Sequence, residues 1–358
     1  MKITTIIGAR PQFIKAATVS RTFLKINNIQ EIIIHTGQHF DSNMSDVFFE
    51  EMEIPKPIYN LNINSLSHGA MTGQMIEKIE NILLMEKPDW VLLYGDTNST
   101  LAGTIAAKKL HIKIAHVEAG LRMFEMRNPE EINRIVTDRL SDILFCPSQI
   151  AINNLIIEGF NNFGCQIVNS GDVMYDAALF YKNKAKKPKG NLPEKFHLCT
   201  MHRAENTDNI INLKSIISAL ETISKITPVL FPIHPRTKNI LKSIDYNFNK
   251  SNIIFIEPIG YLEMIWLLKN CNLVFTDSGG IQKEAYFFEK YSIIFNTKTP
   301  WIELNEMGYN RLVGSNKEDI IESFNFFSNM PKSGFGLKLY GQGDASKKIT
   351  EHMISYCN

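Results

Sequence analysis

The chain consists largely of short apolar runs of strand length, each followed by a glycine or turn residue and then by a helical pattern. Runs that are apolar on both faces predict parallel sheets covered by helices on each side. We therefore expect an α/β protein of two doubly wound halves that face each other across a cleft. The expected strands lie at 3–8, 31–37, 90–96, 112–120 and 142–148 in a first series, and at 196–202, 227–234, 252–258, 271–279 and 291–297 in a second.

The length of the chain also favours two domains. It has 358 residues, of which 44% are hydrophobic, enough for two separate cores at roughly 150 residues per domain. A lysine- and proline-bearing segment at 184–195 interrupts the apolar pattern and is typical of a surface connection. We expect one domain over 1–170, a second over 171–343, and an amphipathic helix over 344–358.

Composition excludes several classes of function. The 38 Lys and Arg residues balance 37 Asp and Glu residues, so the net charge of +1 gives no bulk attraction to nucleic acid or to an anionic membrane. The sequence contains neither a secretory signal pattern nor a run of about 18 apolar residues, and we expect a cytoplasmic protein. Its 5 cysteines are scattered singly without metal-ligand spacing, which predicts buried, reduced thiols and no structural metal.

Ligands of doubly wound sheets bind beyond the carboxyl ends of the strands, so polar residues there are candidate site residues. After the first strand, Gly8 leads to a helix start bearing Arg10 and Lys15, two cations suited to a phosphate or carboxylate. The alternative is a helix-flanking pair that forms only salt bridges. The segment is not GxGxxG, so no nicotinamide cofactor is expected.

Three carboxylates follow later strands of the first half. Asp96 and Glu118 end strands, and Glu130 lies in the first turn of a predicted helix. Singly, each has an ordinary explanation as a helix cap or first-turn acid. Together they indicate proton transfer, since desolvated or repelling carboxylates have raised pKa values.

The second half offers cations, histidines and a glycine-rich helix start. His202 and Arg203 follow its first strand, and His234 follows its second, which favours anion binding and proton transfer over a structural role. Ser278, Gly279 and Gly280 open a helix whose free backbone N–H groups suit a diphosphate, and Glu284 is placed to accept hydrogen bonds from a ribose. Close helix packing is the other explanation for the two glycines.

These motifs, in this order, closely resemble the non-hydrolysing UDP-N-acetylglucosamine 2-epimerase family along nearly the whole chain. The resemblance implies two Rossmann-like domains in a GT-B-like arrangement, a homodimer, and a C-terminal helix that packs back on the first domain. It also implies a UDP-sugar substrate, with no nucleic-acid or membrane partner and no cofactor. The implied chemistry is inversion at C2 by elimination of UDP, a glycal intermediate and re-addition of UDP.

The resemblance also implies roles for individual residues. Asp96, Glu118 and Glu130 would be the acid/base carboxylates, and the sequence leaves open which of them serves which face of the sugar. His202 and Arg10 would lie at the diphosphate and help it leave, with Lys15 near the sugar or phosphate. The remaining UDP or substrate contacts would come from Arg122, Arg203, His234, Ser278, Gly279, Gly280 and Glu284.

Finer details are similar to the branch acting on UDP-2,3-diacetamido-2,3-dideoxyglucuronate. The opening GARPQFIKA, the segment at 35–52 and TPWIEL at 299–304 carry this likeness. The stretch 296–303 lacks the arginine and acid of the usual RDxTE, and Lys298 is a candidate substitute. A uronate needs a cation, for which Arg122, Arg127 or Lys15 are candidates. Because GQH is followed by 40–43 FDSN, activation by substrate is not expected.

Alternatives remain at this point. A UDP-N-acetylglucosamine 2-epimerase is the nearest, and a GT-B glycosyltransferase shares the fold and nucleotide site but needs fewer acids around C2. A UDP-sugar-binding protein without chemistry would be expected to lack some of the carboxylates. A hydrolysing enzyme differs only in letting water intercept the intermediate.

Overall fold

The computed structural model describes residues 1–38, 49–50, 52–331 and 334–356. These residues form two compact units. The first unit comprises Met1–Ala177 together with Lys338–Asn358, and the second comprises Ala178–Leu337. The segment 184–195 thus belongs to the second unit, and most of the segment 35–52 that separates the family branches lies outside the described residues.

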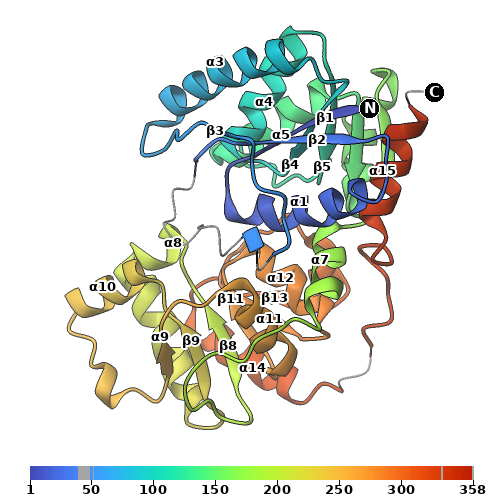
Figure 1. The fold of residues 1–358 in the computed structure, drawn as a ribbon. Coiled ribbons are helices and arrows are strands. Elements are labelled where there is room, and N and C mark those ends of the chain that lie inside the picture. Colours follow the sequence, from blue (N-terminus) through green and yellow to red (C-terminus); the bar gives the residue numbers. More distant parts are fainter. Residues whose placement is uncertain (39–48, 51, 332–333, 357–358) are drawn as a thin grey trace. The chain divides into compact units, whose positions relative to one another are not determined.

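The first unit is a parallel sheet with helices on both faces (Figure 1). Its elements are β1 (Lys2–Ile7), α1 (Arg10–Phe23), β2 (Gln30–His35), β3 (Tyr59–Asn60), α3 (His68–Glu86), β4 (Trp90–Tyr94), α4 (Asn98–Lys109), β5 (Lys113–Val117), α5 (Pro129–Leu140), β6 (Ile143–Cys146), α6 (Gln149–Ile157), the 3₁₀ turn η1 (Phe160–Asn162), β7 (Gln166–Asn169), α7 (Val173–Tyr181) and α15 (Ala345–Ser355). The 7 strands follow the order β3-β2-β1-β4-β5-β6-β7.

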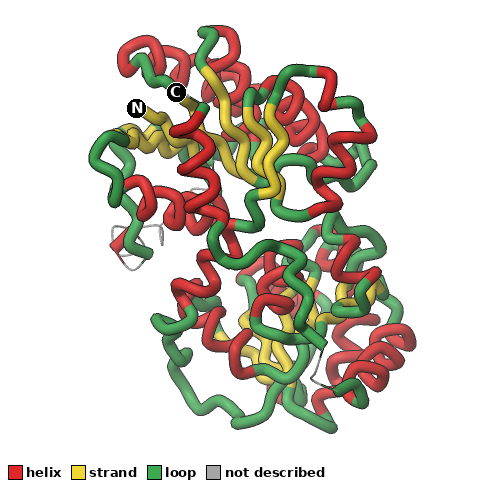
Figure 2. Tube along the Cα trace, turned by 90° about the vertical axis from the view of Figure 1, so that its right-hand side faces the viewer, coloured by secondary structure: helices red, strands yellow, loops and turns green. Residues whose placement is uncertain are grey.

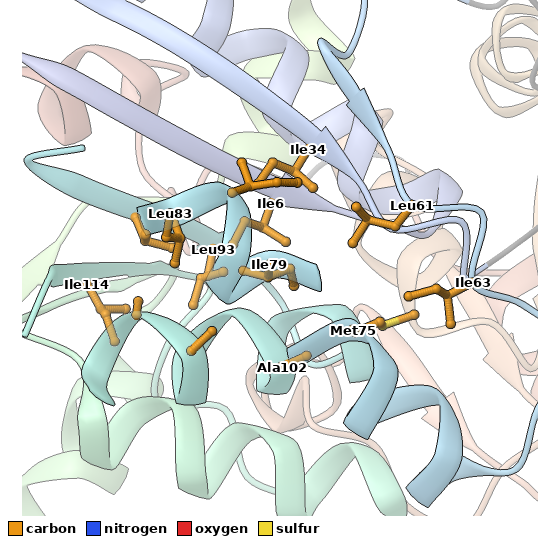
Figure 3. Close-up of a cluster of buried hydrophobic side chains, with 14 of the residues drawn as sticks. Ile6, Ile34, Leu61, Ile63, Met75, Ile79, Leu83, Leu93, Ala102 and Ile114 are labelled. Atoms are coloured by element: carbon orange, nitrogen blue, oxygen red, sulfur yellow. The ribbon is translucent and has the colours of Figure 1, made fainter. Parts of the chain in front are cut away.

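Apolar side chains on one face of this sheet pack against α3 and α4 (Figure 3). Ile6 of β1, Leu93 of β4 and Ile114 of β5 are each 0% exposed within this cluster, as are Met75 and Ile79 of α3. Continuous burial of this kind explains why the strands appear in the sequence as uninterrupted apolar runs.

Helix α15 lies against α1, although the two are far apart in sequence (Figure 1). The ring of Tyr356, just past α15, meets the ring of Trp90 edge-on at 5.1 Å between centroids. At the other end, the Asp176 carboxylate accepts hydrogen bonds from the backbone N–H groups of Ala345 and Ser346, at 3.1 and 2.8 Å. A carboxylate at these first amides is favourable because the helix N-terminus is partially positive.

The second unit repeats the same architecture on a smaller scale (Figure 2). Its elements are β8 (His197–Thr200), α8 (Ala204–Thr207), α9 (Ile210–Ser224), β9 (Val229–Pro232), α10 (Pro235–Ser243), η2 (Phe248–Lys250), β10 (Ile254–Ile256), α11 (Tyr261–Asn270), β11 (Val274–Thr276), α12 (Gly279–Phe287), β12 (Ser292–Ile294), α13 (Ile302–Glu306), β13 (Asn310–Leu312) and α14 (Lys317–Ser328). The 6 parallel strands follow the order β10-β9-β8-β11-β12-β13.

Every strand expected from the apolar runs is present, and the prediction of two doubly wound parallel sheets is confirmed. The strand order reverses between β1 and β4 in the first unit and between β8 and β11 in the second. Ligands of such sheets bind in the crevice beyond the carboxyl ends of the strands at this reversal. Each unit therefore has one expected binding edge.

Other expectations from composition concern membranes, metals and thiols. No helix among the described residues is long and apolar enough to cross a membrane. Within the same part of the chain, no group of three or more His, Cys, Asp or Glu side chains is arranged to hold a metal ion. Cys146, Cys199 and Cys271 are buried free thiols, whereas Cys165 is half-buried.

Candidate active site

The turn between β1 and α1 is held tightly at the binding edge of the first unit. The N–H groups of Gly8 and Ala9 both donate to Gln12 Oε1, at 2.8 and 3.0 Å. The Gln12 side-chain amide in turn donates to the carbonyl of Tyr94 at the end of β4. A Cβ at Gly8 would lie only 2.0 Å from Thr36 Oγ1, so this position requires glycine. The β1–α1 turn is therefore fixed against the end of the neighbouring strand.

Lys15 and Glu118 form an ion pair at this edge. Lys15 Nζ lies 2.6 Å from Glu118 Oε2, and their side chains are only 10% and 8% exposed. Glu118 follows β5 and has a backbone φ of +74°, a conformation that is uncommon for a residue with a side chain. Strained backbone of this kind clusters at functional sites. Glu118 is thus a buried carboxylate with a fixed counter-ion.

A second carboxylate, Asp96, is held by Arg134 of α5. Arg134 Nε and Nη2 lie 3.0 and 2.9 Å from Asp96 Oδ2, and Arg134 also contacts the buried carboxylate of Glu131. Burial alone would lower the pKa of Arg134, but the two carboxylates more than offset it and leave that pKa raised. The N–H groups of Met123 and Phe124 donate to Glu131, which therefore shapes the loop before α5.

Glu130 stands apart from these pairs. It is exposed at the start of α5, where its own N–H donates to the side chain of Asn128 at 3.2 Å. Of the two adjacent acids, Glu131 is taken up by the protein framework and Glu130 faces solvent. Of these two acids, Glu130 is therefore the candidate for contact with a substrate.

Arg122 belongs to the buried framework of the first unit. Its Nε and Nη2 donate to Glu158, at 2.7 and 2.8 Å, and its Nη1 donates to Asp138 at 2.7 Å and to the carbonyl of Leu121. The side chain is 1% exposed. Protein acceptors therefore engage both ends of the Arg122 guanidinium, and a contact of Arg122 with substrate stays a prediction.

Asp138 also connects the two turns that carry Asp96 and Glu118. His116 Nδ1 lies 2.7 Å from Asp138, and His116 Nε2 lies 2.7 Å from the carbonyl of Gly95. The His116 ring thereby bridges the carboxylate of Asp138 and the backbone of Gly95. Burial would raise the pKa of Asp138, but hydrogen bonds and charge from His116 and Arg122 hold it below its ordinary value.

In the second unit, buried Asp277 organises the turn after β8. Its carboxylate accepts the backbone N–H groups of His202 and Arg203, at 3.1 and 2.9 Å, and the side-chain amide of Asn206. The side chain of His202 is 52% exposed, with Nδ1 lying 3.4 Å from Asp277. Partial burial, together with the nearby Arg203 and His234, lowers the pKa of His202 against the opposing effect of Asp277.

His234 occupies the corresponding place after β9, the strand beside β8. It is exposed and caps α10, where the Arg236 N–H donates to His234 Nδ1 at 3.2 Å. Arg236 itself is paired with Asp208. His202, Arg203 and His234 therefore line one edge of the second sheet, as expected for residues that follow adjacent parallel strands.

Helix α12 begins at the same edge with an accessible N-terminus. The Ser278 hydroxyl accepts a hydrogen bond from the N–H of Ile281 and caps the helix. A Cβ at Gly279 would meet its nearest atom at 3.5 Å, and one at Gly280 at 3.9 Å, which are ordinary contacts. Close helix packing therefore does not explain the two glycines. They leave space beside the first amides of the helix, whereas Glu284 lies buried on α12, one turn further along.

The loop that lacks the RDxTE pattern is fastened to α12. Thr299 Oγ1 donates to Gln282 at 2.8 Å, and the N–H of Trp301 donates to Thr299 at 3.2 Å. Lys283 Nζ lies 3.8 Å from the centre of the Trp301 ring. Trp301 Nε1 lies 3.5 Å from the position of a Cβ on Gly279, so the indole borders the open helix start.

Sequence reasoning found the strand-end residues but missed several of their partners. Arg134, Asp277 and His116 each lie within a few residues of a candidate site residue in the sequence. Only the structure shows that they hold Asp96, the His202 turn and Gly95. Trp301 could have been found as the aromatic residue of TPWIEL, but no spacing rule links it to Gly279.

The chain is similar to known proteins along its whole length. A profile of the UDP-N-acetylglucosamine 2-epimerase family matches residues 22–354. The UDP-2,3-diacetamido-2,3-dideoxy-D-glucuronate 2-epimerase of Pseudomonas aeruginosa is 53% identical over 355 residues, covering 99% of each chain. A UDP-N-acetylglucosamine 2-epimerase homolog of Methanococcus maripaludis is 50% identical over 361 residues, covering 98% of this chain and 99% of the relative.

Solved structures of UDP-GlcNAc 2-epimerases are also similar to this chain. The crystal structure of the Methanocaldococcus jannaschii UDP-GlcNAc 2-epimerase in complex with UDP-GlcNAc and UDP matches with a TM-score of 0.89 at 42% identity, covering 99% of this chain and 100% of that one. The fold and the matched relatives define a nucleotide-sugar isomerase of the GT-B-like class. The chain belongs to the UDP-N-acetylglucosamine 2-epimerase family, which confirms the family and enzyme class predicted from its sequence.

Proposed function

We propose that the protein inverts C2 of a UDP-2-acetamido sugar, with UDP-2,3-diacetamido-2,3-dideoxy-D-glucuronate as its substrate and the mannuronate epimer as its product. The observation that carries the proposal is the pair of carboxylates beyond the adjacent strands β4 and β5, each with its own cation. The relative from Pseudomonas aeruginosa supports this choice of substrate. The second candidate, UDP-N-acetylglucosamine, is favoured by the names of several other relatives.

The proposed reaction couples loss of the C2 proton to departure of UDP. The C2 hydrogen is scarcely acidic, because no carbonyl is adjacent to it, so proton removal and C1–O cleavage occur together to give a glycal and UDP. Reprotonation at C2 from the opposite face and re-addition of UDP at C1 complete the inversion. Atoms and charges balance without an oxidant, and neither a cofactor nor a divalent ion is required.

Proton transfer is assigned to Asp96, Glu118 and Glu130. Lys15 pairs with the buried carboxylate of Glu118, and Arg134 pairs with the half-buried carboxylate of Asp96. Such carboxylates are preorganised bases, and each becomes an acid once it has received the proton. Which carboxylate acts on which face stays open.

Binding and departure of UDP are assigned mainly to the second unit. The first amides of α12, with Ser278, Gly279 and Gly280, suit the phosphates, and Glu284 is assigned to the ribose. His202, Arg203 and His234 line the same sheet edge and are assigned to the diphosphate, to which Arg10 of the first unit also contributes. Cations and helix amides stabilise the negative charge that develops as the C1–O bond breaks.

A uronate carboxylate needs a cation, and Arg127 is the best candidate. Lys15 is already paired with Glu118, and Arg122 is buried in the framework. Arg127 is exposed on the loop just before α5, and Glu130 lies in the first turn of that helix. We expect Arg127→Met to raise KM for the uronate about tenfold while leaving KM for UDP-N-acetylglucosamine unchanged. An equal effect on both substrates would remove Arg127 from this role.

The deciding experiment is incubation of the protein in D2O with each UDP-sugar separately, followed by NMR of the C2 deuterium content and configuration. Exchange and inversion with the uronate alone establish both reaction and substrate. Turnover of UDP-N-acetylglucosamine moves the protein to the second candidate. Absence of exchange with either sugar contradicts the epimerase proposal, and accumulation of free UDP with time indicates hydrolysis.

Three wider expectations accompany this proposal and stay predictions. We expect the product to serve synthesis of a surface polysaccharide such as a lipopolysaccharide O-antigen, the enzyme to act in the cytoplasm, and the chain to form a homodimer. Sedimentation velocity measures the last of these directly.

A further inference from the structure

A cavity of about 550 Å³ lies at the amino ends of the strands of the second sheet, opposite its proposed UDP-binding edge. It is bordered by His197 at the start of β8, by Tyr291 just before β12, and by Phe324 and Phe327 of α14. This volume is typical of a pocket for a small molecule. His197 begins β8 and His202 follows its end. About 17 Å of extended chain separates them, so the cavity is distinct from the proposed UDP-binding edge.

His197 is the unusual member of this lining. The residue is only 5% exposed. Neither of its ring nitrogens has a hydrogen-bond partner in the part of the chain that the structure describes. Its neighbours are the rings of Phe275 and Phe324, which meet it edge-on at 5.9 and 5.4 Å. Both ring nitrogens are closed to a water-sized molecule, so a ligand hydrogen-bonds the imidazole only when the ring turns toward the cavity, and it then satisfies a buried polar group.

Burial lowers the pKa of His197 to about 4, so the ring is neutral at pH 7. A neutral imidazole offers one donor and one acceptor. Tyr291 and Phe327 stack at 4.9 Å between centroids with a 14° angle between their planes, and they form an aromatic wall of the cavity. These features suit a planar ring with a polar edge.

The charged residues that line the cavity favour a ligand with an acidic group. Lys195 and Lys290 line it with a single carboxylate, Glu289, so its charged residues have a net positive charge. Lys195 borders the cavity and is exposed to solvent. We propose that this cavity is a second ligand site, separate from the UDP site, which binds a small aromatic or heteroaromatic acid through the His197 edge, the Tyr291 wall and the Lys195 cation.

The test uses full-length protein labelled with ¹⁵N in its histidines, and indole-3-carboxylate as the probe. The His197 imidazole signals, assigned by their loss in His197→Phe, should shift saturably with the probe at concentrations up to about 10 mM. Indole and cyclohexanecarboxylate, which lack the acid or the aromatic ring, should bind more weakly by about fivefold or more. Saturating UDP should not displace the probe.

Four variants sharpen the result. His197→Phe should weaken the probe about tenfold while leaving UDP affinity unchanged, and His197→Gln, which keeps a donor and an acceptor, should restore part of the binding. Lys195→Met should weaken indole-3-carboxylate but not indole. Without ligand, His197→Leu should raise Tm, because it removes an unsatisfied polar group.

The proposal is overturned if the His197 signals do not move, if His197→Phe binds the probe as well as the parent protein does, or if UDP displaces the probe. A fall in Tm for His197→Leu would likewise oppose it, since the imidazole would then already be satisfied, for example by an ordered water. None of these readouts depends on epimerase activity, so the proposed function stands or falls separately.

Discussion

The ammonium of Lys15 lies 2.6 Å from the carboxylate of Glu118, joining the first helix of the chain to the turn after β5. Glu118 adopts a φ of +74°, and its N–H and that of Ala119 both donate to the carbonyl of Phe145 at 3.1 Å. The ion pair and these two hydrogen bonds offset a backbone strain of about 1–3 kcal/mol. The fold thereby presents one carboxylate in one fixed orientation.

Lys15→Met should lower kcat about 100-fold, because proton transfer by Glu118 depends on this counter-ion. Without the ammonium, burial disfavours the Glu118 carboxylate, so the acidic limb of the pH–rate profile should move to higher pH. Lys25→Met, the same change at an exposed position just after α1, is the matched control and should leave the profile unaltered. A Lys15→Met enzyme with raised KM and an unmoved profile would instead make Lys15 a binding residue only.

Arg122→Met should lower the free energy of unfolding by about 3–5 kcal/mol, because it leaves the buried Asp138 carboxylate short of a partner. Urea denaturation measures this loss. Arg127→Met, on an exposed side chain, should change the same quantity by no more than about 0.5 kcal/mol. If Arg122→Met kept its stability but raised KM for the uronate, the framework role assigned to Arg122 would be wrong.

Gly280→Ala should separate ligand binding from folding. The added methyl would meet nothing closer than 3.9 Å, and alanine favours the helix, so Tm should stay constant or rise slightly. The same methyl lies beside the amides proposed to hold phosphate, and we expect UDP affinity measured by calorimetry to fall about tenfold. Gly73→Ala in α3, where a Cβ also meets nothing, is the control for the helix effect alone. Unchanged UDP affinity would place the phosphates elsewhere.

Glu31 should make stability depend on pH near neutrality. Burial raises its pKa to about 7, against a hydrogen bond from Thr5 that lowers it. Between pH 4.5 and 7 the unfolded chain releases this proton while the native protein keeps it, so the free energy of unfolding falls as pH rises. The loss is complete above the native pKa and amounts to about 3 kcal/mol.

The check is Glu31→Gln, which removes the titration. It should raise Tm at pH 8 and have little effect at pH 4, where both states of the parent protein are protonated. Glu77→Gln, on an exposed face of α3, should change Tm equally little at both pH values. A Glu31→Gln effect of the same size at both pH values would mean that packing, not ionisation, is responsible.

The sequence predicted the strands that form apolar runs and missed those that do not. Strand β4, WVLLY, is buried at every residue and appears as an unbroken apolar run. By contrast, β7 is QIVN with no fully buried residue, β3 has only 2 residues, and β13 has 3. Short strands of polar or mixed sequence have no apolar signature, and their place in the sheet comes from pairing with a neighbour.

The types and positions of the candidate site residues could be predicted from the sequence, but the residues that each of them contacts could not. The rule that ligands lie beyond strand ends located Asp96 and Glu118, because it depends only on topology. It also selected Arg122, which has the right charge at the right strand end. Arg122 differs from Asp96 and Glu118 because two later carboxylates bind its guanidinium. These are Asp138 of α5 and Glu158 at the end of α6, which come 16 and 36 residues later. Such partners are defined by helix packing and not by local spacing.

The hydrogen bonds from Ala345 and Ser346 to Asp176 tie together two stretches of one unit that are separated by the whole of the other. During synthesis, residues 178–337 are a continuous segment that can fold while translation continues. The earlier unit cannot, because α1 stays uncovered until α15 has left the ribosome. The unit that begins first is therefore completed last. We expect a released fragment of residues 1–337 to resist protease over 178–337 while remaining sensitive over 1–177.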